Sequence, residues 1–161
     1  MNGGFFSRID CYARPHIPAT AWRRSQPRGA QFCRRHSSGG GFLSGSRAQE
    51  EYLARSSALY ACLKNNPMYD FHRVNYDPLY TDYAIYSPEV PVFRADAGLL
   101  LEEPYTVALI TSAAVNAAKL DPGRRSEIAP AMWQRIVKVL AIGALHGHDS
   151  IVLGGLRRFR Q

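Results

Sequence analysis

The sequence predicts a single α/β domain, and three observations lead to this prediction. A helical pattern, several strand-like runs, a longer helical pattern and a last strand-like run follow one another, as in layered α/β proteins. The length of 161 residues suits one domain with its own core. The hydrophobic content of 46% and the charged content of 20% are those of a folded globular protein.

The first 35 residues differ from the rest in composition. They hold seven arginines against one acidic residue, and they show neither a period of two nor one of 3.6. A mitochondrial presequence is also rich in arginine, but the three prolines here would break the helix that it forms. We therefore expect residues 1–35 to be a disordered extension, residues 36–156 to be the folded domain and residues 157–161 to be a basic tail.

The net charge of +7 comes from these two ends, because residues 36–156 carry ten basic and twelve acidic side chains. A nucleic-acid-binding domain needs a basic face on its folded part, so no nucleic-acid partner is expected. No apolar run approaches the roughly 20 residues that cross a bilayer, so no membrane partner is expected either. The pattern does not indicate an oligomeric state.

The cysteines and histidines do not predict a metal or a disulfide framework. The three cysteines are irregularly spaced, which favours a reducing, intracellular compartment and a soluble protein. The spacing of His36, His72, His146 and His148 does not make a ligand set, and the last two, at a helix end, are expected on the surface. No metal and no cofactor are therefore expected.

The first helix is predicted from about residue 46 to residue 63. Ser46 and Gln49 fit a capping box, and small or apolar residues then recur at steps of three and four. Residues 65–82 are rich in Asn, Asp, Pro and Tyr, and they are expected to form a long ordered loop. Loops of that length in a compact domain are more often functional than not.

Short strands are predicted next, at 83–86 and 90–93, followed by a turn at Gly98. Residues 105–110 are almost continuously apolar, as in the middle of a sheet that is covered on both faces.

The longest helix is predicted at 124–147, with Gly147 as its stop, and the last strand at 151–153. An open sheet of this kind binds its ligand at the carboxyl ends of its strands.

Residues Gly39-Gly40-Gly41 and, seven residues later, Gln49-Glu50-Glu51 are the candidate site. Glycines allow a ligand to approach the backbone, and amides near a helix start suit an anion or a sugar hydroxyl. Successive helical residues are about 100° apart, so the two carboxylates point differently and can divide ligand positioning from proton transfer. From the residues alone, the alternative that the glutamates only favour the helix dipole and the glycines form a linker stays open.

This pattern resembles the signature of poly(ADP-ribose) glycohydrolases, in which a Gly-Gly-Gly loop is followed by Gln-Glu-Glu. Four segments look like the microbial-type branch of that family: GGGFLSGSRAQEEYLARSSAL (39–59), MYDFHRVNYDPLYTDYAIYSPEVPVFR (68–94), LEEPYTVALITSAAVNA (101–117) and the helix that ends in AIGALHGHDSIVLG (141–154). The resemblance extends over about 36–154. It implies a macrodomain-like, three-layer α/β/α fold with a mixed sheet that binds poly(ADP-ribose) or ADP-ribose.

The resemblance also implies a role for each site residue. Glu51 would be the catalytic residue, giving its proton to the leaving oxygen and then taking one from water. Burial and the charge of Glu50 would raise the pKa of Glu51 so that it holds its proton near neutral pH. Gln49 and Glu50 would bind ribose hydroxyls, and the backbone of Gly39, Gly40 and Gly41 would pack against the diphosphate and ribose.

At both ends the sequence departs from the family pattern. Family members have strands and helices before the glycine loop, and a second glycine-rich loop after the strand that ends near Gly154; here residues 157–161 stand in its place. The resemblance therefore predicts a fold that lacks N-terminal and C-terminal family elements. Two other interpretations stay open, a non-catalytic ADP-ribose-binding macrodomain and an inactive fragment of the enzyme.

Overall fold

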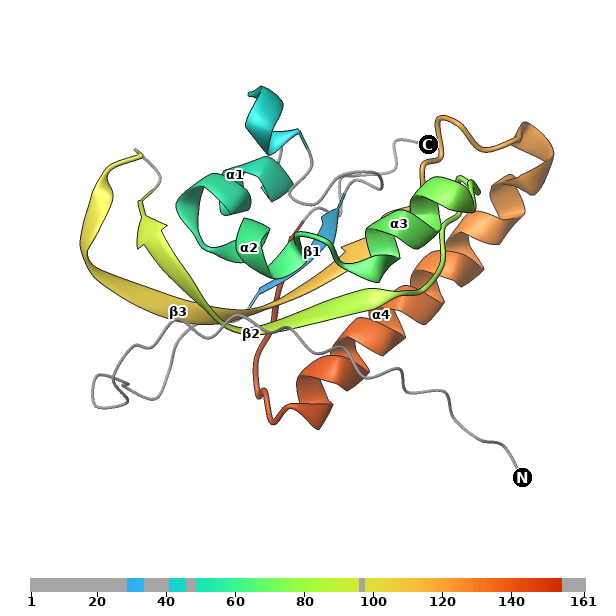
Figure 1. Cartoon of the computed structure of the whole chain (residues 1–161). Coiled ribbons are helices and arrows are strands. Elements are labelled where there is room, and N and C mark those ends of the chain that lie inside the picture. Colours follow the sequence, from blue (N-terminus) through green and yellow to red (C-terminus); the bar gives the residue numbers. More distant parts are fainter. Residues whose placement is uncertain (1–28, 34–40, 46–48, 96–97, 155–161) are drawn as a thin grey trace.

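A four-stranded mixed sheet lies between helices on its two faces in the computed structural model (Figure 1). The structure describes residues 29–33, 41–45, 49–95 and 98–154, with side chains at 41, 43–45, 50–95 and 98–153. The strands stand in the order β2-β3-β1-β4, with bounds β1 Gly29–Cys33, β2 Ala84–Arg94, β3 Leu100–Ala113 and β4 Val152–Gly154. β1 runs parallel to both of its neighbours, and β2 runs antiparallel to β3.

The expected boundary at residue 36 is wrong for residues 29–33, because these form β1 in the middle of the sheet. Gly29 is in register with Leu109 of β3 on one side and with Val152 of β4 on the other. A five-residue central strand depends on backbone pairing with its neighbours, so it needs no alternation of its own. The rest of the expected extension, residues 1–28, and the expected basic tail, residues 157–161, lie outside the described residues.

The expected single helix at 46–63 is two helices, α1 (Gln49–Ser56) and α2 (Leu59–Leu63). Ser57 separates them: its hydroxyl donates to the carbonyl of Leu53 at 2.7 Å and accepts from the amide of Leu59 at 3.2 Å. The amide of Ala58 donates to the carbonyl of Pro91 in β2, at 2.9 Å, instead of to its own helix. A contact with the sheet therefore creates the break. The spacing of small residues continues across it, which is why the sequence predicts one helix.

The expected loop at 65–82 contains a third helix, α3 (Pro67–Val74). Asn66 caps it by accepting a 3.0 Å hydrogen bond from the amide of Met68, and Pro67 occupies the first turn. Both positions suit a helix start, because asparagine is a good N-cap and proline needs no donor there. The expectation of a loop is therefore correct only for the residues after Val74.

β2 carries a bulge that changes which face of the sheet its side chains meet. Ser87 pairs with Leu109 and Val90 pairs with Val107, so β2 has one more residue between these pairs than β3. Glu89 takes up the extra residue with a φ of +51°. After the bulge, Val90 faces the same core as Ile85 although their numbers differ in parity.

Two apolar clusters, one on each face of the sheet, form the described core. One lies under α2 and α3 and joins Leu59, Leu63, Met68, Tyr69, Ile85, Val90 and Leu109. The other lies under the last long helix, α4 (Ile128–Leu145), and joins Ala84, Ile110 and Val139. Figure 1 shows α1–α3 on one side of the strands and α4 on the other, which is the expected three-layer arrangement.

The 3-10 helix η3 (Pro122–Glu127) and α4 together form one helical stretch, Pro122–Leu145. By length and composition alone, this stretch is long and apolar enough to cross a membrane. The expectation that no segment reaches that length is therefore wrong for the described residues. Core helices of folded proteins have the same length and composition, and α4 packs Val139 against the sheet. The expectation that the protein has no membrane partner stays a prediction.

Candidate active site

The first turn of α1 holds the two candidate glutamates in a buried position. Glu50 is 3% exposed and Glu51 is 1% exposed. The amide nitrogen of Gly41 donates a 2.9 Å hydrogen bond to Oε1 of Glu51. This bond joins the glycine loop to the helix across ten residues of chain, so the loop orients the carboxyl group directly.

A short turn after Gly41 holds that amide in place. The 3-10 helix η2 (Phe42–Ser44) begins there, and the carbonyl of Gly41 accepts 3.0 Å hydrogen bonds from both the amide and the hydroxyl of Ser44. Gly45 follows with a φ of +82°, in a region that suits glycine. Gly41 is thus hydrogen-bonded through both its amide nitrogen and its carbonyl oxygen.

Tyr69 connects α3 to Glu50 of α1. Its hydroxyl lies 3.4 Å from Oε1 of Glu50, a long hydrogen bond, and the tyrosine is 2% exposed. Each glutamate therefore meets a different partner: Glu51 meets the glycine turn, and Glu50 meets α3. This is the division that the angular offset of successive helical residues predicts.

The structure brings together three of the six predicted site residues, namely Gly41, Glu50 and Glu51. Gly39 and Gly40 lie outside the described residues. Gln49 begins α1, and the structure describes its backbone only. The roles predicted for all six residues stay predictions.

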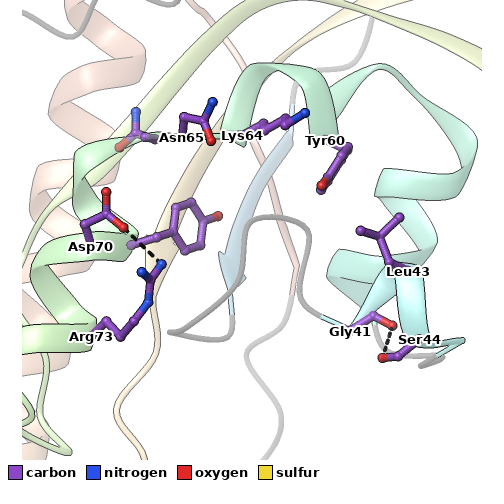
Figure 2. A pocket seen from close by; sticks show the side chains of 10 residues that line it. Gly41, Leu43, Ser44, Tyr60, Lys64, Asn65, Asp70 and Arg73 are labelled. Atoms are coloured by element: carbon purple, nitrogen blue, oxygen red, sulfur yellow. Dashed lines mark hydrogen bonds and ion pairs between the residues drawn. The ribbon is translucent and has the colours of Figure 1, made fainter.

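A cavity of about 730 Å³ opens beside Gly41 and Tyr69, the hydrogen-bond partners of the glutamates, and we call it the Tyr60 pocket. Figure 2 shows Tyr60 and Lys64 along one wall, Leu43 and Ser44 near the glycine turn, and Asp70 and Arg73 at the far end. Its full lining is Gly41, Leu43, Ser44, Tyr60, Lys64, Asn65, Asn66, Tyr69, Asp70 and Arg73. Because Gly41 contacts Glu51 and Tyr69 contacts Glu50, the pocket shares a wall with the site.

A buried arginine of α4 anchors the loop that follows α3. Arg135 is 2% exposed, and its guanidinium donates to the carbonyls of Leu79, of Tyr80 at 2.7 Å and of Thr81 at 3.2 Å. Burial lowers the pKa of Arg135. Thr81 in turn lies 2.7 Å from Nε2 of the buried His72 in α3. The anchor therefore positions α3, which carries Tyr69.

A surface ion-pair group holds the same loop at its outer edge. The backbone amide of Leu79 lowers the pKa of Asp77 through a 2.9 Å hydrogen bond, and Arg124 of η3 adds to this effect. Arg124 also bonds Glu127, which raises the pKa of Arg124 and lowers that of Glu127. Exposed pairs of this kind add little to stability individually.

Among the described residues, no group of three His, Cys, Asp or Glu side chains could hold a metal ion. His146 is exposed and stacks on Tyr86 with 3.8 Å between ring centroids, and Nε2 of His148 lies 2.8 Å from the Tyr86 hydroxyl. His36 lies outside the described residues. The expectation of a metal-free protein stays a prediction.

Sequence reasoning missed the residues of α2 and α3 that line the Tyr60 pocket. Treating 65–82 as a loop hid the regular side-chain spacing of Tyr69, Asp70 and Arg73. The pair Asn66-Pro67 was the available signal, because an N-cap followed by proline marks a helix start.

The layers and the placement of the glutamates define the class of protein. A sheet with helices on both faces and a glycine turn at a helix start beside it correspond to the macrodomain-like fold that the sequence predicts. A protein-family model, "Microbial-type PARG, catalytic domain", matches residues 20–95. This segment therefore matches the microbial-type poly(ADP-ribose) glycohydrolase (PARG) family, which confirms the resemblance.

Solved structures of poly(ADP-ribose) glycohydrolases resemble the chain over a wider range. The enzyme from Thermomonospora curvata is 51% identical, with a TM-score of 0.76 over 81% of this chain and 49% of that chain. The same enzyme bound to the inhibitor ADP-HPD gives 50% identity and a TM-score of 0.75 over 80% of this chain and 50% of that one. The Deinococcus radiodurans enzyme in complex with ADP-ribose gives 39% identity and a TM-score of 0.74 over 81% and 55%.

The chain spans about half the length of these solved structures. The match begins before the glycine loop, at residue 20, which agrees with β1 being part of the fold. Comparison with curated proteins gave no significant match.

Proposed function

We propose that the chain carries the catalytic centre of a poly(ADP-ribose) glycohydrolase, with Glu51 as the general acid and base. The substrate is poly(ADP-ribose), and the bond cleaved joins C1 of one ribose to the 2′-oxygen of the next. The hydrogen bond between the Gly41 amide and the buried Glu51 carboxyl is the observation that supports this proposal most directly.

The chemistry follows from where the proton is needed. A ribose 2′-oxygen is a poor leaving group, so the C1–O bond breaks when a carboxylic acid protonates that oxygen. Glu51 supplies this proton while positive charge develops at C1, and it then takes a proton from the water that attacks C1. The products are ADP-ribose and a polymer one unit shorter, and Glu51 returns to its starting form.

Burial and orientation suit Glu51 to this role. The carboxyl group of Glu51 is 1% exposed, so it is shielded from bulk water. The 2.9 Å bond from Gly41 occupies Oε1, so the other carboxyl oxygen is the one that can carry the proton. Glu50, next to Tyr69, would bind a ribose hydroxyl, as would Gln49, and the backbone of Gly39, Gly40 and Gly41 would pack against the diphosphate.

A second candidate function is ADP-ribose binding without turnover, including that of an inactive fragment. The observation that favours it is coverage, because the chain spans about half the length of the enzymes that it matches. The acidic pair favours catalysis, since binding alone does not require a proton donor at the scissile bond.

The experiment is to incubate the purified chain with poly(ADP-ribose) and to follow free ADP-ribose by chromatography. Glu51→Ala is the matched control, and circular dichroism of both proteins checks that they fold alike. Release above that of Glu51→Ala supports the glycohydrolase proposal. Equal release by the two proteins, with ADP-ribose still bound, supports the second candidate.

A further inference from the structure

The glycine turn and the glutamates account for only one side of the bond that is cleaved. A glycosidic bond inside a polymer has a released unit on one side and a leaving unit on the other, and both have to be held for the acid to be in position. The leaving unit of poly(ADP-ribose) is itself a nucleoside diphosphate sugar, with an aromatic base and two negative phosphates. A site for it therefore needs a flat apolar surface and positive charge next to Glu51.

The Tyr60 pocket has these features. Its volume of about 730 Å³ lies in the range of ligand sites of about 300–1,000 Å³. Tyr60 offers a half-buried aromatic side chain. Aromatic side chains of this kind stack on nucleic-acid bases without regard to base identity. Figure 2 shows Tyr60 between Lys64 and the turn that holds Leu43 and Ser44.

The charges of the pocket are complementary to a diphosphate. Lys64 is exposed, and no carboxylate in the part of the chain that the structure describes pairs with it. Arg73 is paired with Asp70 at 3.0 Å through one nitrogen, which leaves other guanidinium donors of its fork for a ligand. Asn65 adds an amide at the rim, with a φ of +62° that a tight turn imposes.

The position of the pocket relative to the acid places it next to the scissile bond of the proposed reaction. Gly41 both lines the pocket and donates to Glu51, and Tyr69 both lines the pocket and contacts Glu50. The pocket thus begins at Gly41 and Tyr69, the hydrogen-bond partners of the two glutamates, and extends from them toward Arg73 on α3.

We infer that the Tyr60 pocket binds the ADP-ribose unit on the leaving side of the scissile bond, with Tyr60 stacking on its adenine and Lys64 contacting its diphosphate. This inference rests on the proposed function, because it takes the reacting carboxyl to be that of Glu51. It adds a substrate preference: the chain binds two linked ADP-ribose units better than one.

The test compares the binding of ADP-ribose with that of a two-unit ADP-ribose oligomer. Binding is measured by calorimetry with the whole chain carrying Glu51→Gln, so that the oligomer stays intact. The oligomer is expected to bind more tightly than ADP-ribose. Tyr60→Ala is expected to weaken oligomer binding about tenfold, the effect of one lost base stack, and to leave ADP-ribose binding unchanged. Tyr60→Phe keeps the ring and is expected to bind like the parent.

Charge is tested with a matched pair of lysines. Lys64→Ala should weaken oligomer binding and reduce its dependence on salt, whereas Lys119→Ala, on an exposed residue outside the pocket, should change neither.

Equal loss of ADP-ribose and oligomer binding in Tyr60→Ala would overturn the inference, because the pocket would then hold a single nucleotide or the released unit. No loss of oligomer binding, or no binding of either ligand by the parent chain, would overturn it as well. Failure of the proposed function is visible separately, because the chain that retains Glu51 would then release no more ADP-ribose from poly(ADP-ribose) than Glu51→Ala does.

Discussion

The amide of Gly41 and the carboxylate of Glu51 form a 2.9 Å hydrogen bond that connects the glycine turn to the first turn of α1. This bond fixes the orientation of the proposed acid before any substrate binds. A preoriented proton donor needs less rearrangement during the reaction, which is where positioning lowers a barrier.

Glu51→Gln is expected to lower ADP-ribose release from poly(ADP-ribose) by a factor of about 10²–10⁴ while ADP-ribose binding is retained. Glutamine preserves the shape and can still accept from Gly41, but it cannot deliver a proton. Release rates and calorimetric binding separate the two effects. Turnover at the parent rate would move the catalytic role to another residue.

Arg135→Met is expected to destabilise the fold by about 2–4 kcal/mol, because it leaves the carbonyls of Leu79, Tyr80 and Thr81 without their donor. The free energy of unfolding is measured by urea denaturation. Lys138→Ala is the control on the same helix: it removes an exposed 2.8 Å ion pair with Asp82 and should cost less than about 1 kcal/mol. Similar losses of unfolding free energy in both variants would show that Arg135 stabilises the fold no more than the exposed ion pair of Lys138 does.

Ser57→Ala is expected to cost about 1–2 kcal/mol of folding free energy. The serine is 3% exposed, and its hydroxyl bonds Leu53 and Leu59 at the break between α1 and α2. Ser150→Ala, at an exposed serine, provides the comparison. A neutral result for Ser57→Ala in urea denaturation would mean that the contact of Ala58 with Pro91 maintains the break alone.

Asp77→Asn is expected to make the melting temperature less dependent on pH in the acid range. The pKa of Asp77 is lowered in the folded protein, first by the Leu79 amide and then by Arg124. A lowered folded-state pKa stabilises the protein above the unfolded-state value of 3.8, and this contribution is lost as the pH falls through the folded-state pKa. Melting curves of both proteins between pH 7 and pH 3 should therefore converge toward the acid end.

The sequence predicted those parts of the fold that local patterns encode. Gly147 ends the long helix at a φ of +71° and Gly98 turns between β2 and β3 at +79°, both as expected of glycine at such positions. The break at Ser57 and the bulge at Glu89 were missed, since each is created by contact between the strands or between a helix and a strand.

The sequence also predicted only part of the candidate site. Glu51 could be identified from the sequence because it belongs to the short motif Gln49-Glu50-Glu51. The Tyr60 pocket could not, because its walls come from the glycine turn, α2 and α3, and only the folded chain brings these segments together.

The central place of β1 also sets the order of events during synthesis. Its two partners are made later, because β3 begins at Leu100 and β4 begins at Val152. Residues 29–33 therefore leave the ribosome with both of their backbone edges unpaired until β3 and then β4 have been made. Pairings between such distant segments form slowly, so the unpaired edges of β1 are exposed to aggregation for longer than the segments of a helical protein with local contacts.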